Sequence, residues 1–198
     1  MVPFLLSYDY RCPFAKNMHL HLIAAQRAGA NYDVTFVPWT MSQGHKPEGA
    51  PDVWADEKQD KVNLALTVSI SIRDQQPDHF LDAHEALFRA RHEQGMRLND
   101  FDQLRQILSP LGVDMDAVAA DLETRRPHQV LGESFAHMAT FEAFGVPTFV
   151  VNNDATFVRY MKPPTDDAAA SKTIIDTLVS LMEHHVEINE FKHTKVPN

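Results

Sequence analysis

Short apolar runs at both ends of the chain enclose a long middle region in which apolar residues recur every three or four positions. Residues 3–8 form a brief apolar run of the kind that predicts a strand. From Pro13 to Ala28 the apolar positions follow steps of three and four and stop at Gly29, which predicts a helix. Residues 33–39 predict a second strand, so the chain opens in the order strand, helix, strand.

The middle region, after a loop at residues 44–51, is predominantly helical by pattern. Its predicted helices span residues 78–94, 99–111, 114–124 and 128–144, with Asn99 as an N-cap and Gly95, Gly112 and Gly145 as stops. From Val62 to Ile72, however, alternate residues are apolar, which is a strand period. We predict a helix there, because an isolated strand inside a helical block would leave its backbone groups unpaired.

Strand character returns after Gly145. Residues 147–151 and 155–160 flank the turn sequence Asn152-Asn153-Asp154, which is typical of a β-hairpin. Asp166 or Asp167 is then placed to cap a last helix. The predicted buried stripe of that helix is Ile174, Leu178, Leu181 and Met182. The pattern as a whole predicts an α/β protein with a helical insertion.

Charge and apolar run lengths exclude several classes of partner. The formal net charge is −9 and no Lys/Arg-rich run is present, which disfavours nucleic acid and anionic lipid surfaces. No apolar stretch approaches the ~20 residues that span a membrane. The run from Val2 to Leu6 is too short for a signal sequence and has no basic residue before it. We therefore expect a soluble, cytoplasmic protein with no membrane partner.

Cys12 is the only cysteine in the chain, and it lies between the first predicted strand and the first predicted helix. Pro13 follows it, and proline is favoured at the first position of a helix. Free N–H groups at a helix start favour a thiolate over a thiol, and Arg11 adds positive charge. We therefore expect an exposed, nucleophilic Cys12, against the alternative of a buried structural thiol. A lone cysteine also fits a reducing compartment.

Other polar residues do not form a recognisable site. The 11 histidines show no spacing typical of metal ligands, so we predict no metal site and interpret them as solvated side chains. Acidic clusters fit helix starts better than acid–base chemistry. Neither of the glycine-rich motifs that bind nucleotides is present.

Two segments carry a resemblance to a known family. Tyr10-Arg11-Cys12-Pro13-Phe14-Ala15 resembles the active-site loop of the DsbA-like family, and Gly145-Val146-Pro147-Thr148-Phe149 resembles its cis-proline loop. The resemblance covers nearly the whole chain. It implies a thioredoxin-like domain of residues 1–51 and 145–198 with a helical insertion domain of residues 52–144. Residues 189–194, Asn-Glu-Phe-Lys-His-Thr, are similar to the tail of small actinobacterial members.

The resemblance also implies roles for individual residues. Cys12 would be the nucleophile and Pro13 would fix the helix start. The substrate-binding residues would be Val146, Pro147 and Thr148, with a cis Val146–Pro147 bond, together with Tyr8, Tyr10, Arg11 and Phe14 around the sulfur. Ala15 stands where the resolving cysteine of a C-x-x-C motif would be, so this chain cannot carry out a dithiol cycle.

The resulting hypothesis is a monothiol oxidoreductase, a monomer or homodimer without a tightly bound cofactor. Cys12 would attack a disulfide or an electrophile, and an external small thiol, mycothiol or glutathione, would resolve the adduct. Omega-class glutathione transferases share the Cys-Pro-Phe-Ala loop, but here Pro147 follows Cys12 only after the long helical region. Two alternatives stay open. One is a kappa-like thiol transferase or 2-hydroxychromene-2-carboxylate-type isomerase, although these generally carry serine at the position of Cys12. The other is a non-enzymatic peptide-binding module.

Overall fold

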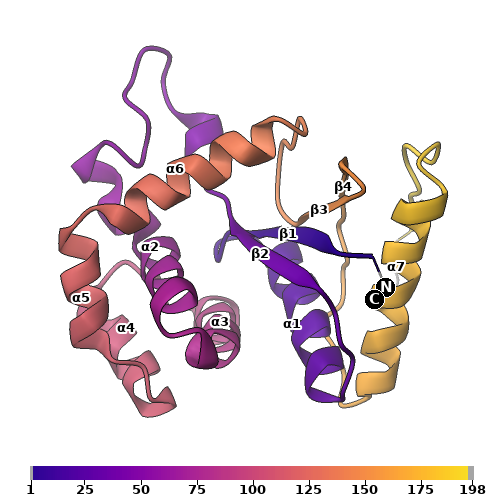
Figure 1. Cartoon of the computed structure of the whole chain (residues 1–198), viewed down its shortest axis with the longest axis horizontal. Helices are drawn as coiled ribbons and strands as arrows, with labels where there is room; N and C mark the ends of the chain where they lie inside the picture. Colours follow the sequence, from indigo (N-terminus) through magenta and orange to yellow (C-terminus); the bar gives the residue numbers. More distant parts are fainter. Residues whose placement is uncertain (1, 196–198) are drawn as a thin grey trace.

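A computed structural model describes residues 2–195 and shows a four-stranded sheet flanked by helices (Figure 1). The strands are β1 (Phe4–Tyr8), β2 (Val34–Pro38), β3 (Thr148–Val151) and β4 (Asp154–Phe157). They lie in the order β2-β1-β3-β4, with β1 parallel to β2 and the other neighbouring pairs antiparallel. β1 thus lies between β2, from the first part of the chain, and β3, from its second half. This mixed sheet agrees with the predicted α/β fold.

Seven α-helices surround this sheet in the described part of the chain. They are α1 (Pro13–Arg27), α2 (Asp60–Gln75), α3 (Pro77–His92), α4 (Phe101–Leu108), α5 (Met115–Glu123), α6 (Arg126–Ala139) and α7 (Ala168–His184). Three short 3₁₀ turns add to them, at Gln43–His45, Glu57–Gln59 and Ser109–Leu111. No helix among residues 2–195 is long and apolar enough to cross a membrane.

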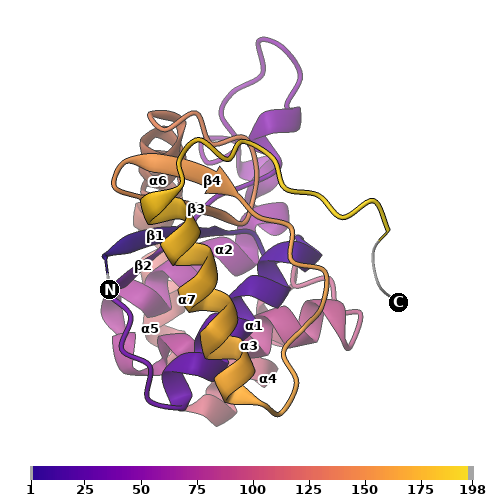
Figure 2. The same ribbon diagram turned by 90° about the vertical axis from the view of Figure 1, so that its right-hand side faces the viewer.

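The helices form two groups. α1 and α7 pack against each other beside the sheet, whereas α2 to α6 gather on its other side (Figures 1 and 2). The groups also touch, because α3 packs against α1 and α6 against β2. A division into domains at residues 51/52 and 144/145 stays a prediction.

Local sequence signals place most element ends correctly. Asn152 and Asn153 both have positive φ, +50° and +69°, as a two-residue hairpin turn requires, whereas Asp154, predicted as part of the turn, is the first residue of β4. The Asp167 carboxylate accepts hydrogen bonds from the N–H groups of Ala169 and Ala170 and so caps α7. The prediction of Asn99 as an N-cap is wrong, because Asp100 caps α4 by accepting a bond from the Gln103 N–H.

Two predicted features of the last helices are also wrong. α6 ends at Ala139 rather than at Phe144, since the chain turns there and Glu142 takes a left-handed φ of +57°, which a helix does not contain. In α7 the buried face is Ser171, Ile175, Val179 and Met182, and Leu181 is 42% exposed. Apolar residues occupy more than one face of α7, and contact with α1 and β3 selects the face that is buried.

The ambiguous segment from Val62 to Ile72 is helical, as predicted. Its misleading period has a physical cause. α2 contacts α3, α5 and α6, and every residue from Ala65 to Ile72 is buried. A helix that is enclosed on all sides needs no amphipathic period, so the alternation of serine and threonine with aliphatic residues carries no strand information.

A chain of buried hydrogen bonds joins the sheet to both groups of helices. The Tyr10 hydroxyl lies 2.7 Å from His84 Nδ1 on α3, and His84 Nε2 lies 2.9 Å from His19 Nδ1 on α1. His19 Nε2 lies 3.1 Å from the backbone oxygen of Ser7 on β1. Both histidines are fully buried, so the prediction that the histidines are solvated is wrong for this pair.

The Ser7 carbonyl oxygen can only accept a hydrogen bond, and this sets the direction of all three bonds. The Ser7 carbonyl accepts, so His19 donates from Nε2 and its Nδ1 accepts from His84. His84 Nδ1 is then left to accept from the Tyr10 hydroxyl. Both rings are neutral, and burial lowers the pKa of His19 to about 4 and that of His84 well below its usual value.

We expect the free energy of unfolding to fall as the pH drops from about 6.5 to about 4. His19 and His84 are neutral in the folded protein but take up protons once unfolded, so the unfolded state binds more protons over this range. The contribution of the two neutral histidines to the free energy of unfolding is fully present above the pKa of an unfolded histidine and is lost as the pH falls below it. For His19 the loss is roughly 3 kcal/mol, measured by urea unfolding at a series of pH values.

His19→Gln provides the control for the acid effect. A glutamine amide can still donate to the Ser7 carbonyl but does not titrate. The variant should show a shallower pH dependence of the unfolding free energy than the wild type. Parallel pH dependences would contradict the assignment of this acid sensitivity to the buried histidines.

Candidate functional site

The backbone places Cys12 at the start of α1. It is the N-cap residue, with extended backbone angles, and Pro13 is the first helical residue. The Ala15 N–H points at Cys12 Sγ over 3.5 Å, and the Cys12 N–H donates to the backbone oxygen of Asp9. The sulfur therefore takes the role that a serine or aspartate oxygen usually fills at a helix N-terminus.

The cis-proline loop lies directly against this sulfur. The Cys12 thiol donates to the Val146 carbonyl oxygen at 3.1 Å, and the Val146–Pro147 peptide bond is cis, as the family resemblance implies. Thr148 anchors the loop on β1, because its N–H donates to the Ser7 hydroxyl oxygen at 2.9 Å. Residues more than 130 positions apart thus meet at one point.

Cys12 is buried rather than exposed, so this part of the sequence interpretation is wrong. Only 6% of its surface is accessible. Burial raises the pKa of the thiol, and this outweighs the Ala15 and Phe14 N–H groups, which lower it; the Asp9 carboxylate raises it further. The helix start acts on the sulfur as expected, but the packing of the cis-proline loop over it has the larger effect.

An ion pair that the sequence analysis missed holds the loop before Cys12. Asp9 is 1% exposed, and its carboxylate accepts bonds from the Arg11 guanidinium, the Arg11 N–H and the Met41 N–H. Arg11 also donates to Ser42 and Thr40. The charge of Arg11 is thus directed at Asp9 and the loop after β2. The Asp-x-Arg spacing at the end of a predicted strand was the available signal.

The remaining predicted site residues from β1 to α1 are buried or half-buried. Tyr8 and Tyr10 are buried, and their hydroxyls bond to Ser69 and His84, so both side chains lie in the core and not on an exposed surface around the sulfur. Phe14 is half-buried and packs on the core, and Ala15 is fully buried.

A hollow is formed by residues on both sides of the cis-proline loop. It is lined by Phe141, Glu142, Ala143, Phe144, Thr148, Ala155 and Phe157. Phe144 is 76% exposed, and its ring centroid lies 5.1 Å from that of Phe157. The lining of this hollow combines the aromatic rings with the polar side chains of Glu142 and Thr148. Among residues 2–195, no group of three or more His, Cys, Asp or Glu side chains is arranged to hold a metal.

Comparisons with known proteins agree with this geometry. The cytosolic disulfide reductase DsbM from Pseudomonas aeruginosa, solved with GSH, has 17% identity and a TM-score of 0.61, covering 91% of this chain and 100% of that one. The thiol-disulfide oxidoreductase MdbA from Actinomyces oris has 15% identity and a TM-score of 0.60, covering 88% and 79%. A thioredoxin-like oxidoreductase from Silicibacter pomeroyi has 18% identity and a TM-score of 0.57, covering 90% and 87%.

At these identities the structural neighbours establish the fold alone. A search of curated protein sequences found no significant match. The family model of the DSBA-like thioredoxin domain, however, matches residues 5–167, which include both Cys12 and the cis-proline loop. The chain therefore belongs to the DSBA-like thioredoxin domain family.

Proposed function

We propose that the protein is a monothiol oxidoreductase in which Cys12 exchanges with disulfides or attacks electrophiles. The observation that carries the proposal is the contact between the Cys12 thiol and the Val146 carbonyl beside Pro147, in a chain with no second cysteine. A substrate that bonds to the Val146 backbone would displace the thiol from this carbonyl. The sulfur would then depend on the N–H groups of Phe14 and Ala15, which lower its pKa.

The exchange takes place in two balanced steps. The Cys12 thiol loses its proton to solvent, and the thiolate attacks one sulfur of a disulfide RSSR, which forms Cys12–S–SR and releases RS⁻. An external thiol R′SH, as its thiolate, then attacks this adduct, which forms RSSR′ and releases Cys12 as a thiolate that takes up a proton from solvent. Ala15 cannot perform the second step, so the external thiol is required.

Glutathione or mycothiol is the proposed co-substrate. The disulfide reductase DsbM, whose fold this chain shares, was solved with GSH, which supports a small thiol here. A reducing cytoplasm would supply such a thiol and keep the lone cysteine reduced. A monomer or homodimer without a tightly bound cofactor is sufficient for this chemistry.

Intact mass spectrometry after incubation with oxidised glutathione tests the proposal. We expect one added glutathionyl group on the wild type, none on Cys12→Ser, and removal of the group by excess reduced thiol. Because the chain has one cysteine, the mass alone identifies the site. A wild type that stays unmodified by oxidised glutathione and by other small disulfides would refute the proposal.

Ala15→Cys tests the need for an external thiol. It places a second thiol three residues after Cys12, a separation that a disulfide can span at a helix start. This variant should release the glutathionyl group without added thiol and lose two hydrogens in mass, because Cys12 forms a disulfide with the introduced thiol, whereas Ala15→Ser keeps the adduct. An equally long-lived adduct in the two variants would argue against Ala15 as the cause of the monothiol chemistry.

The alkylation of Cys12 should titrate above the pKa of a free thiol, about 8.5. Burial raises the pKa of this thiol, so the rate with iodoacetamide is expected to keep rising beyond the pH at which a cysteine peptide reaches its plateau. Rates from about pH 6 to about pH 11, compared with such a peptide, give the value. A rate that levels off at a lower pH than for the peptide would show that the effect of the helix start on the pKa outweighs that of burial.

Asp9→Asn should change stability and reactivity in opposite directions. The variant removes a buried carboxylate that pairs with Arg11, at a cost of about 2–4 kcal/mol in unfolding free energy. It also removes a negative charge that raises the pKa of Cys12, so that pKa should fall slightly. Urea unfolding and the alkylation titration measure the two effects, and a rise in the Cys12 pKa would contradict this electrostatic account.

A kappa-like thiol transferase is the second candidate function. The buried Cys12 with its raised pKa favours it, because a cysteine that only hydrogen-bonds to a bound thiol needs no thiolate character. This function predicts reversible binding of reduced glutathione that survives Cys12→Ser, with no covalent adduct. Calorimetric titration of the wild type and this variant distinguishes it from the exchange reaction.

A further inference from the structure

The pairing of β1 with β3 changes its hydrogen-bond acceptor directly before the cis-proline loop. The register places Leu6 opposite Phe149, so the next opposite pair is Ser7 and Thr148. At this position the Thr148 N–H donates to the Ser7 hydroxyl oxygen, over 2.9 Å. Ser7 is 0% and Thr148 1% exposed, so water cannot replace this acceptor.

The backbone acceptor of Ser7 serves another group. Its carbonyl oxygen lies 3.1 Å from His19 Nε2, and the neutral ring of His19 donates to it. A side chain of α1 thus bonds to the carbonyl that an antiparallel ladder would offer to β3. The Ser7 hydroxyl takes over the Thr148 N–H, which an aliphatic side chain at position 7 would leave unsatisfied.

The bond at Thr148 also sets the position of the group that covers the sulfur. Thr148 Oγ1 donates to the Gly145 carbonyl at 2.7 Å, which ties the start of β3 to the beginning of the loop. Between these two residues lies Val146, whose carbonyl oxygen accepts the Cys12 thiol at 3.1 Å. A movement of Thr148 away from Ser7 therefore carries the Val146 carbonyl away from the sulfur.

We propose that Ser7 is a positioning residue for the exchange reaction: its hydroxyl holds the start of β3 so that the Val146 carbonyl stays over Cys12 Sγ. Ser7 acts on the sulfur through Thr148 and Val146. The role rests on the proposed exchange reaction, but the experiment measures only the protonation of Cys12 with iodoacetamide. Its outcome therefore does not depend on whether the protein reacts with a disulfide.

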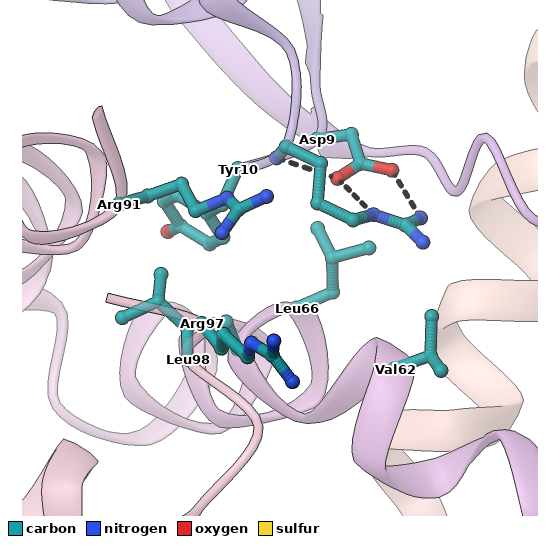
Figure 3. Close-up of a pocket in the computed structure, with 9 residues that line it drawn as sticks. Asp9, Tyr10, Val62, Leu66, Arg91, Arg97 and Leu98 are labelled. Atoms are coloured by element: carbon teal, nitrogen blue, oxygen red, sulfur yellow. Dashed lines mark hydrogen bonds and ion pairs between the residues drawn. The ribbon is translucent and has the colours of Figure 1, made fainter. Parts of the chain in front are cut away.

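The pH dependence of Cys12 alkylation in Ser7→Ala tests the role. Without the hydroxyl the Thr148 N–H loses its acceptor and the loop shifts, so the thiol is less buried and no longer donates to a carbonyl. Both changes favour the thiolate. The midpoint of the pH–rate profile should move to lower pH, and the rate at about pH 7.5 should rise at least about threefold. The ion pair of Asp9 with Arg11 (Figure 3) remains in this variant and does not contribute to the change.

Two further variants separate positioning from a general loss of stability. Ser7→Thr keeps a hydroxyl and should return the profile toward that of the wild type. Ser171→Ala is the matched control, because Ser171 is also fully buried and its hydroxyl lies 3.0 Å from His21 Nδ1, roughly 13 Å along α1 from Cys12. It should lower the thermal midpoint of unfolding without moving the alkylation profile. An unchanged profile in Ser7→Ala, or an equal shift in Ser171→Ala, would refute the proposal.

A measurement on the wild type keeps the test valid if Ser7→Ala does not fold. Alkylation of Cys12 displaces the Val146 carbonyl, so the bond between Thr148 and Ser7 should loosen in return. We expect the Thr148 amide to exchange with deuterium at least about tenfold faster in the alkylated protein, with unchanged exchange in α7. Equal exchange at Thr148 before and after alkylation would overturn the proposal.

Discussion

The buried hydrogen bonds from Tyr10 through His84 and His19 to Ser7 are the constraint on which the rest of the structure depends. They link the loop before Cys12, the helical group, α1 and the central strand in one chain of neutral donors and acceptors. Each ring nitrogen has a partner, so the loss of one bond would leave its donor and its acceptor buried and unsatisfied. Ser7 extends the chain to the cis-proline loop, because its hydroxyl accepts the Thr148 N–H. The position of the sulfur is therefore fixed from both sides.

Two opposing effects act on Cys12, and they arise at different levels of structure. The N-cap position is local: it depends on Cys12 and Pro13 and favours the thiolate. Burial is tertiary: it depends on the Val146 carbonyl, which covers the sulfur, and it favours the thiol. In this chain, burial under the cis-proline loop therefore affects the pKa of Cys12 more than the helix start does. Any ligand that moves this loop changes the balance.

The sequence was sufficient to predict the order of strands and helices, the hairpin turn at Asn152 and Asn153, and the approach of Cys12 to the Val146–Pro147 segment. Periodicity and turn chemistry are local, and the resemblance supplied the long-range contact. The burial of His84 was missed, although its spacing from Phe80 and Phe88 at i−4 and i+4 on one buried face of α3 was a usable signal. The buried Asp9–Arg11 pair was missed because its geometry depends on the loop after β2. The exposure of Leu181 depends on which helix face meets α1 and β3, which the pattern alone does not specify.

The fully buried methyl group of Ala15 has a consequence for the lifetime of the proposed adduct at Cys12. In a dithiol enzyme the second sulfur makes release of the adduct a unimolecular event with a rate set by the protein. Here, in the proposed exchange, release is bimolecular, so the lifetime of the adduct varies inversely with the concentration of free thiol around the protein. One small side chain at the first turn of α1 would thus transfer control of turnover from the fold to the surrounding thiol pool.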